Sequence, residues 1–87
     1  MKPETMNLII KAVEHARKKH PHFADDLNHA VCLATEELGE MVKAINDNKP
    51  WNEVCAEAYD TIAVLVRIVE EKCASAYFTT VLSLPRT

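Results

Sequence analysis

Residues 36–40, Glu-Glu-Leu-Gly-Glu, and residues 57–60, Glu-Ala-Tyr-Asp, decide how this chain folds. Each stretch carries two carboxylates three residues apart, Glu37 with Glu40 and Glu57 with Asp60. Because three residues is close to one helical turn, both acids of a pair project from the same side of a helix. Like charges at this spacing repel, so a divalent cation between two such helices would relieve the repulsion. Carboxylates without a matching set of His or Cys ligands indicate Mg²⁺ or Mn²⁺ rather than zinc.

Apolar residues recur at helical spacing around both acid pairs, and they predict which side of each helix faces the core. The acids interrupt a second side that is itself partly apolar, with Leu33 and Ala44 beside one pair and Val64 and Ile68 beside the other. We therefore expect this second side to be covered as well. The two predicted core stripes are Leu27, Ala30, Val31, Ala34, Leu38, Met41, Val42 and Ile45, and Val54, Ala58, Ile62, Leu65, Val66 and Val69.

The sequence predicts an all-α fold with three main helices in a small antiparallel bundle. The first opens near Pro3 with Thr5 as N-cap and ends at Lys19. The second is capped by Asp25 or Asp26 and runs to about Asn46, and the third spans about 51–72. The turn between them is short, which favours antiparallel neighbours. A short helix or irregular tail is expected after Cys73, and the whole of 1–87 forms one domain with its motif core at about 27–72.

Composition predicts self-association. The chain has 87 residues, of which 48% are hydrophobic and only one is glycine. A domain of this size stabilises its core only marginally when alone. We expect a homo-oligomer, a dimer or a tetramer, in which a second copy packs against the side that carries Val64 and Ile68.

The charge and the cysteines restrict partners and compartment. A formal net charge of −3 argues against a nucleic-acid partner. No apolar run approaches the length of a membrane span, so we expect no membrane partner. The odd number of cysteines, Cys32, Cys55 and Cys73, predicts buried thiols and a cytoplasmic location. The histidines His20, His22 and His29 fit no standard zinc spacing.

The pattern Glu-Glu-x-x-Glu, a short gap and Glu-x-x-Asp on the next helix resembles the MazG-type all-α nucleoside triphosphate pyrophosphohydrolases. The resemblance covers roughly residues 29–71, including the Leu38-Gly39 filling. It implies Mg²⁺-dependent hydrolysis of a (d)NTP to the (d)NMP and pyrophosphate. Carried over by position, it implies the metal ligands Glu37, Glu40, Glu57 and Asp60, and a catalytic set of Glu36, Glu37 and Glu40.

Candidate substrate contacts lie near the acids. Lys43, Lys49 and Arg67 could supply cations for phosphate, and Trp51 could stack on a base. Two alternatives remain open at this point. One is an enzyme like phosphoribosyl-ATP pyrophosphohydrolase, and the other is a non-catalytic helical interaction module.

Overall fold

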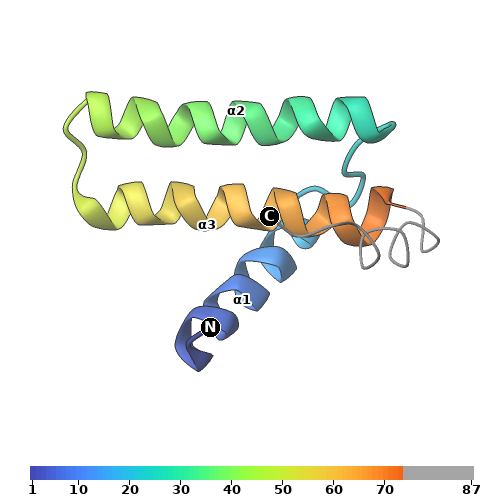
Figure 1. The fold of residues 1–87 in the computed structure, drawn as a ribbon, viewed down its shortest axis with the longest axis horizontal. Helices are drawn as coiled ribbons and strands as arrows, with labels where there is room; N and C mark the ends of the chain where they lie inside the picture. Colours follow the sequence, from blue (N-terminus) through green and yellow to red (C-terminus); the bar gives the residue numbers. More distant parts are fainter. Residues whose placement is uncertain (74–87) are drawn as a thin grey trace, which may run out of the picture.

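The structure, a computed structural model, describes residues 1–73 of the chain. Its elements are α1 (Pro3–Lys19), α2 (Leu27–Asn46), α3 (Trp51–Arg67) and η1 (Ile68–Lys72), a π-helical turn that continues α3 (Figure 1). No strand occurs among these residues, which confirms the all-α prediction. The expected element after Cys73 lies outside the described residues.

Helices α1 and α2 both pack against α3. Helices α2 and α3 run antiparallel side by side, and α1 crosses α3 on another side (Figure 1). Within the described residues, α1 and α2 do not pack against each other. None of the described helices combines the length and apolar character needed to cross a membrane. Helix α3 is therefore the common scaffold on which the other two are mounted.

Local capping explains where the helices begin. Helix α1 starts at Pro3 with Lys2 as N-cap, so the prediction of Thr5 as N-cap was wrong. Proline fixes the backbone in a helical conformation and suits this first position, which starts the helix earlier. Asp26 caps α2 as predicted, and its side chain accepts the backbone N–H of His29 at 2.8 Å.

The turn between α2 and α3 is closed by Asn48. This residue has a φ of 54°, in the left-handed region that Asn tolerates better than most residues. Its N–H donates to the carbonyl of Ile45 at 3.1 Å, and the Lys49 N–H donates to the carbonyl of Ala44 at 2.9 Å. This pair of bonds is a Schellman motif, which satisfies the last carbonyls of α2 and reverses the chain.

Helix α1 is fastened to α3 by Arg67. This side chain is only 2% exposed, and Nη1 donates to the carbonyls of Ala16 at 3.2 Å and His20 at 2.9 Å. The guanidinium also binds the Glu71 carboxylate and lies 4.7 Å from the centroid of the Phe23 ring. Its hydrogen bonds are thus directed within the chain, and the prediction of Arg67 as a substrate-binding residue stays a prediction.

The interior of the described chain is built from small side chains. No residue with a large side chain is fully buried among residues 1–73. Such a core removes little apolar surface from water. The buried hydrophobic residues are Val13, Ala24, Ala30, Ala44, Val54 and Ala63.

The predicted core side of α2 was largely wrong. Helix α3 packs against the side of α2 that carries alanines, among them Ala30 and Ala44, since small side chains let two helices approach closely. The acids Glu37 and Glu40 point toward this side, and the large apolar residues are left outside. The predicted core residues that are exposed are Leu27, Val31, Leu38, Val42 and Ile45 on α2, with Leu65 and Val69 beyond them.

Two further predictions concern burial. Val64 and Ile68, expected to face a second copy, are half-buried in the single chain, and Val64 lines a cavity, so their packing against a second copy stays a prediction. The cysteines Cys32, Cys55 and Cys73 were expected to be buried thiols, but all three are free and exposed.

Candidate metal centre

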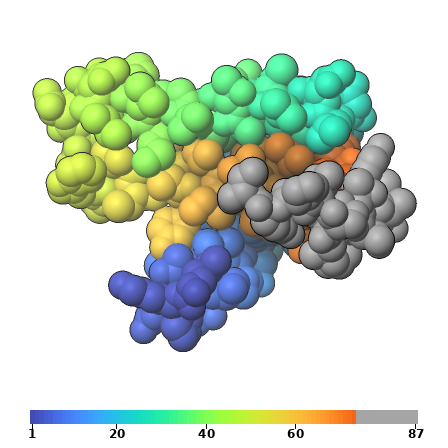
Figure 2. All heavy atoms as spheres, in the orientation of Figure 1, coloured from blue at the N-terminus to red at the C-terminus, as the bar shows by residue number. Residues whose placement is uncertain are grey.

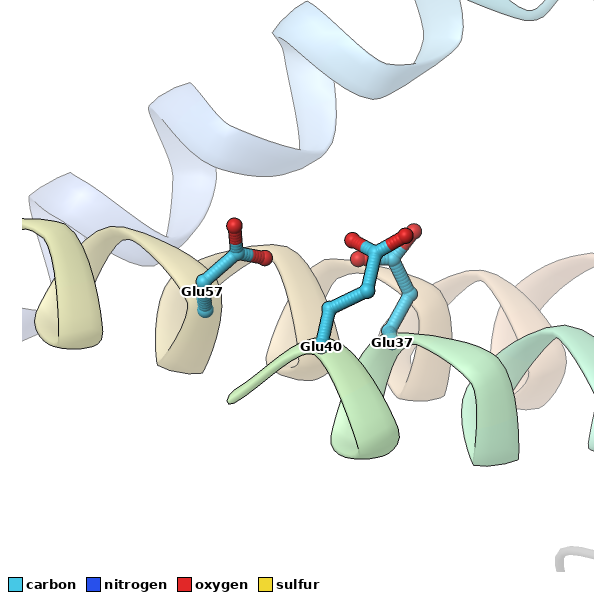
Figure 3. A group of neighbouring side chains, drawn as sticks. All are labelled: Glu37, Glu40 and Glu57. Carbon is cyan, nitrogen blue, oxygen red and sulfur yellow. The ribbon is translucent and has the colours of Figure 1, made fainter. Parts of the chain in front are cut away.

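Three of the four predicted acids meet between α2 and α3. Glu37 and Glu40 project from α2, and Glu57 projects toward them from α3 (Figure 3). Each residue offers one carboxylate oxygen, and these oxygens all lie within 4.8 Å of one another. The antiparallel turn at Asn48 sets the register that brings these side chains level. We refer to Glu37, Glu40 and Glu57 as the acid cluster.

Glu57 is the least satisfied member of the acid cluster. Its Oε2 has almost no accessible surface and no hydrogen-bond partner among residues 1–73. Burial raises the pKa of its carboxyl, and the negative charges of Glu40 and Asp60 raise it further. A buried carboxylate oxygen without a donor is costly, and a cation or a proton would satisfy it.

Glu37 is in a similar environment. Burial raises the pKa of its carboxyl, followed by the charges of Glu40 and Asp60. Both carboxyl groups are therefore harder to ionise than an ordinary glutamate. Raised carboxyl pKa values of this kind concentrate at functional sites, although structural clusters also produce them.

Asp60 and Glu36 lie at the edge of the acid cluster. Asp60 is exposed and is not among the oxygens that meet, but its charge raises the pKa of both Glu37 and Glu57. Glu36 is exposed, and its effect on the pKa of Glu37 is the smallest of those that act on it. The structure therefore places these two acids around the cluster rather than in it.

Glu53 is an acid that the sequence analysis did not single out. It lines a groove together with Glu40 and Glu57, and its charge contributes to the raised pKa of Glu57. The signal was present in the sequence, because Glu53 lies one helical turn before Glu57 and shares its side of α3.

A cavity of about 280 Å³ extends from the acid cluster toward the end of α1. Glu37 and Asp60 line it from α2 and α3, and α1 with the loop after it supplies basic and imidazole groups. In Figure 2, α1 projects from the α2–α3 pair as a separate arm, so the cavity lies in the angle between them. The groups from α1 and its following loop are His15, Lys19, His20 and His22, none of which the sequence analysis chose as substrate contacts, whereas the predicted Arg67 lines the cavity from α3.

The remaining predicted substrate contacts lie away from this cavity. Lys43 binds Asp47 at 2.7 Å on the surface, and both residues line the separate groove beside Glu53. Lys49 lines that groove too. Trp51 is 77% exposed at the start of α3. The structure does not bring these residues together at the cavity.

The acid cluster fits a hard divalent cation. Its donors are carboxylate oxygens alone, which suit Mg²⁺ or Mn²⁺, and the unpartnered Oε2 of Glu57 is an oxygen that such a cation would satisfy. Glu37, Glu40 and Glu57 would hold such an ion, with Asp60 beside it.

Comparison of the chain with protein-family models, with curated proteins and with solved structures finds no match.

Proposed function

We propose that this chain is a Mg²⁺-dependent nucleotide pyrophosphohydrolase, which converts a (d)NTP to the (d)NMP and pyrophosphate. The observation that carries the proposal is the acid cluster, in which Glu37, Glu40 and Glu57 meet from antiparallel helices with a buried oxygen that has no partner. The likeness of the motif to the MazG-type enzymes supplies the reaction class.

The acids would divide the work between holding an ion and accepting a proton. When bound, Mg²⁺ would neutralise charge on the phosphate oxygens and lower the pKa of a bound water. Glu37 borders both the acid cluster and the cavity, so besides contributing to the ion site it would lie where a water in the cavity could lose a proton to it. Asp60 faces the same cavity and would help to orient the water.

The cavity would hold the anionic part of the substrate. A triphosphate needs positive charge or hydrogen-bond donors along its length, and phosphoryl chemistry depends mostly on positioning and electrostatics. Lys19 and the imidazoles of His15, His20 and His22 line the cavity opposite the acids. This arrangement would place cations at one end of the substrate and a metal at the other.

A screen of nucleoside triphosphates tests the proposal. The purified chain is incubated with each NTP and dNTP in Mg²⁺, and pyrophosphate and monophosphate are both quantified. We expect equal amounts of the two products from at least one substrate, no activity in chelator, and a loss of at least about 100-fold in Glu57→Gln and Glu40→Gln. Glu14→Gln on the exposed side of α1 is the matched control and should keep full activity.

The main rival is a helical interaction module without catalysis. The exposed apolar side chains of α2 and α3 favour it, because such surfaces usually bind another protein. A module predicts no turnover with any nucleotide and no rise in melting temperature with millimolar Mg²⁺. An enzyme predicts turnover of at least one nucleotide and a rise in melting temperature with Mg²⁺, since a ligand that binds only the native state stabilises it.

A further inference from the structure

Helix α1 has the fewest buried residues of the three helices. Only Val13 of its 17 residues is buried, and within residues 1–73 it packs against α3 but not against α2. Figure 1 shows its N-terminal end projecting clear of the α2–α3 pair. Because a helix with so little buried apolar surface gains little from packing, polar contacts supply a large share of its attachment.

Arg67 makes one of these polar contacts from a buried position on α3. Its Nη1 donates to the carbonyls of Ala16 and His20, which lie one helical turn apart at the end of α1. Both acceptors lie where the helix ends, so a swing of the rest of α1 displaces them least. Salt screens these bonds little, because the Arg67 side chain is buried. We call Arg67 the pivot.

Arg17 makes the other polar contact, and this one is exposed. Its Nη2 lies 2.5 Å from Oε1 of Glu70, and its Nε lies 3.4 Å from Oε2 of Glu71. The side chains of Arg17 and Glu70 are 44% and 54% exposed. Ion pairs this exposed are weak and are screened by salt, so they break at small cost. We call the contact of Arg17 with Glu70 and Glu71 the latch.

The acidic half of the latch belongs to η1. This element is a single π-helical turn, a rare form that is frequent at functional sites. It brings Glu70 and Glu71, which are neighbours in the sequence, to the same guanidinium. Its last residue, Lys72, donates to the carbonyl of Ala24, which is fully buried. The loop after α1 is therefore fixed to η1, and the latch fixes α1 itself.

The cavity beside the acid cluster has α1 as one of its walls. His15 and Lys19 line it from α1, Glu37 lines it from α2, and Ala63 lines it from α3. Its volume of about 280 Å³ is below the roughly 300–1,000 Å³ of pockets that hold small-molecule ligands. A ligand of nucleotide size therefore needs more room than this structure provides. Movement of α1 away from α2 would supply it.

We propose that α1 is a gate to this cavity, which swings about the Arg67 pivot when the latch opens. The structure described here is the closed state. Opening separates His15 and Lys19 from Glu37 and exposes the buried wall at Ala63. The effect of the gate on turnover rests on the proposed function, because the cavity belongs to that site, whereas the movement itself does not.

Thiol labelling measures the opening directly. In the full chain with Cys32, Cys55 and Cys73 replaced by Ser, Ala63→Cys places a single thiol on the cavity wall behind α1, at a position that is 2% exposed. A small aromatic disulfide reacts with this thiol only when α1 has moved aside. Ala30→Cys is the matched control, because Ala30 is buried on α2 and does not line the cavity. We expect Ala63→Cys to react at least about 10-fold faster than Ala30→Cys.

Charge and salt test the latch. Arg17→Gln should raise the labelling rate of Ala63→Cys by about 2- to 5-fold, the range expected for the loss of an exposed ion pair. Raising NaCl from 0.02 to 0.5 M should speed labelling when Arg17 is present and should have little effect in Arg17→Gln. Lys18→Gln removes the same charge at the neighbouring exposed position and should leave the rate unchanged. Arg17→Lys keeps the charge and should restore most of the slow rate.

Two outcomes would overturn the gate. One is equal labelling of Ala63→Cys and Ala30→Cys, since the cavity wall would then be reached only by unfolding. The other is a rate that responds neither to Arg17→Gln nor to salt. If Ala63→Cys fails to fold, Val64→Cys on the same wall replaces it with the same expectations. Because labelling needs no turnover, an absence of nucleotide hydrolysis would count against the proposed function alone.

Discussion

Arg67 on α3 and Glu71 on η1 form a two-pronged ion pair, in which Nε donates to one carboxylate oxygen at 2.7 Å and Nη2 donates to the other at 3.1 Å. The same guanidinium donates to the carbonyls of Ala16 and His20 at the end of α1. One side chain therefore joins the end of α1 to the end of α3.

Removing Arg67 should destabilise the fold strongly. Arg67→Met leaves Glu71 without this partner and removes the side-chain donor to the carbonyls of Ala16 and His20, which we expect to lower the free energy of unfolding by on the order of 3 kcal/mol. Arg67→Lys keeps the charge but loses the planar fork, so it should restore only part of the stability. Urea denaturation followed by circular dichroism measures both. An Arg67→Met variant as stable as the wild type would show that the contacts with α1 contribute nothing.

Glu71 should make the protein sensitive to acid. The hydrogen bonds from Arg67 hold the pKa of the Glu71 carboxyl below its ordinary value of 4.5. A group whose pKa is lowered by folding contributes stability above its unfolded pKa and loses it as the pH falls through the folded one. We therefore expect this contribution to be complete above about pH 4.5 and to disappear below it. Melting curves of the wild type and Glu71→Gln should converge at low pH, and curves that stay equally far apart would contradict this.

Neutralising Glu57 should stabilise the protein in the absence of metal. Glu57→Gln removes a charge whose ionisation is opposed by burial and by Glu40, and the new amide can donate to Glu40. We expect a gain of about 1 kcal/mol in chelator, together with a smaller rise in melting temperature on adding Mg²⁺. Differential scanning calorimetry with and without Mg²⁺ measures both effects, and Glu14→Gln should change neither. A lower melting temperature in chelator would mean that the Glu57 carboxylate is paired with a cation of the chain itself.

Substitutions of Asn48 should change the free energy of unfolding according to how well the new residue tolerates a left-handed conformation. Alanine tolerates the left-handed region less well than asparagine because it lacks a polar side chain that can hydrogen-bond locally, so Asn48→Ala should cost about 1 kcal/mol. Asn48→Gly relieves that strain and should be close to neutral, since glycine is the residue most often found at this cap. Chemical denaturation distinguishes the two, with Asn46→Ala in the helix before the turn as control. Equal effects of Asn48→Ala and Asn48→Gly would be inconsistent with a constrained turn.

The end of α2 and the start of α3 could be predicted because their causes are local. Asp26 as a cap and the residues around Pro50 act within a few residues of themselves, and the structure ends α2 and begins α3 where the sequence places them. The meeting of Glu37, Glu40 and Glu57 could be anticipated in the same way, because a short turn between antiparallel helices sets the register.

The orientation of the helices could not be predicted, because it depends on the size of the packing partner. Helix α2 is apolar around more than half of its circumference, so periodicity allows either side to face inward. The alanine side faces inward because its small side chains let α3 approach closely. The large apolar side chains of α2, among them Leu38 and Val42, are left exposed. The contacts of Arg67 with Ala16 and His20 join residues about 50 positions apart, which no local pattern reports.

The separate packing of α1 and α2 on α3 has a consequence for the order of folding. The contacts between α2 and α3 close a loop of only a few residues, from Asp47 to Pro50, so they cost little chain entropy to form. The contacts of α1 with α3 depend on Arg67, whose partners His20 and Ala16 lie 47 and 51 positions earlier in the chain. They therefore close a much longer loop. We expect the hairpin of α2 and α3 to assemble before the rate-limiting barrier and α1 to dock after it, so that substitutions in α1 speed unfolding and leave the folding rate nearly unchanged.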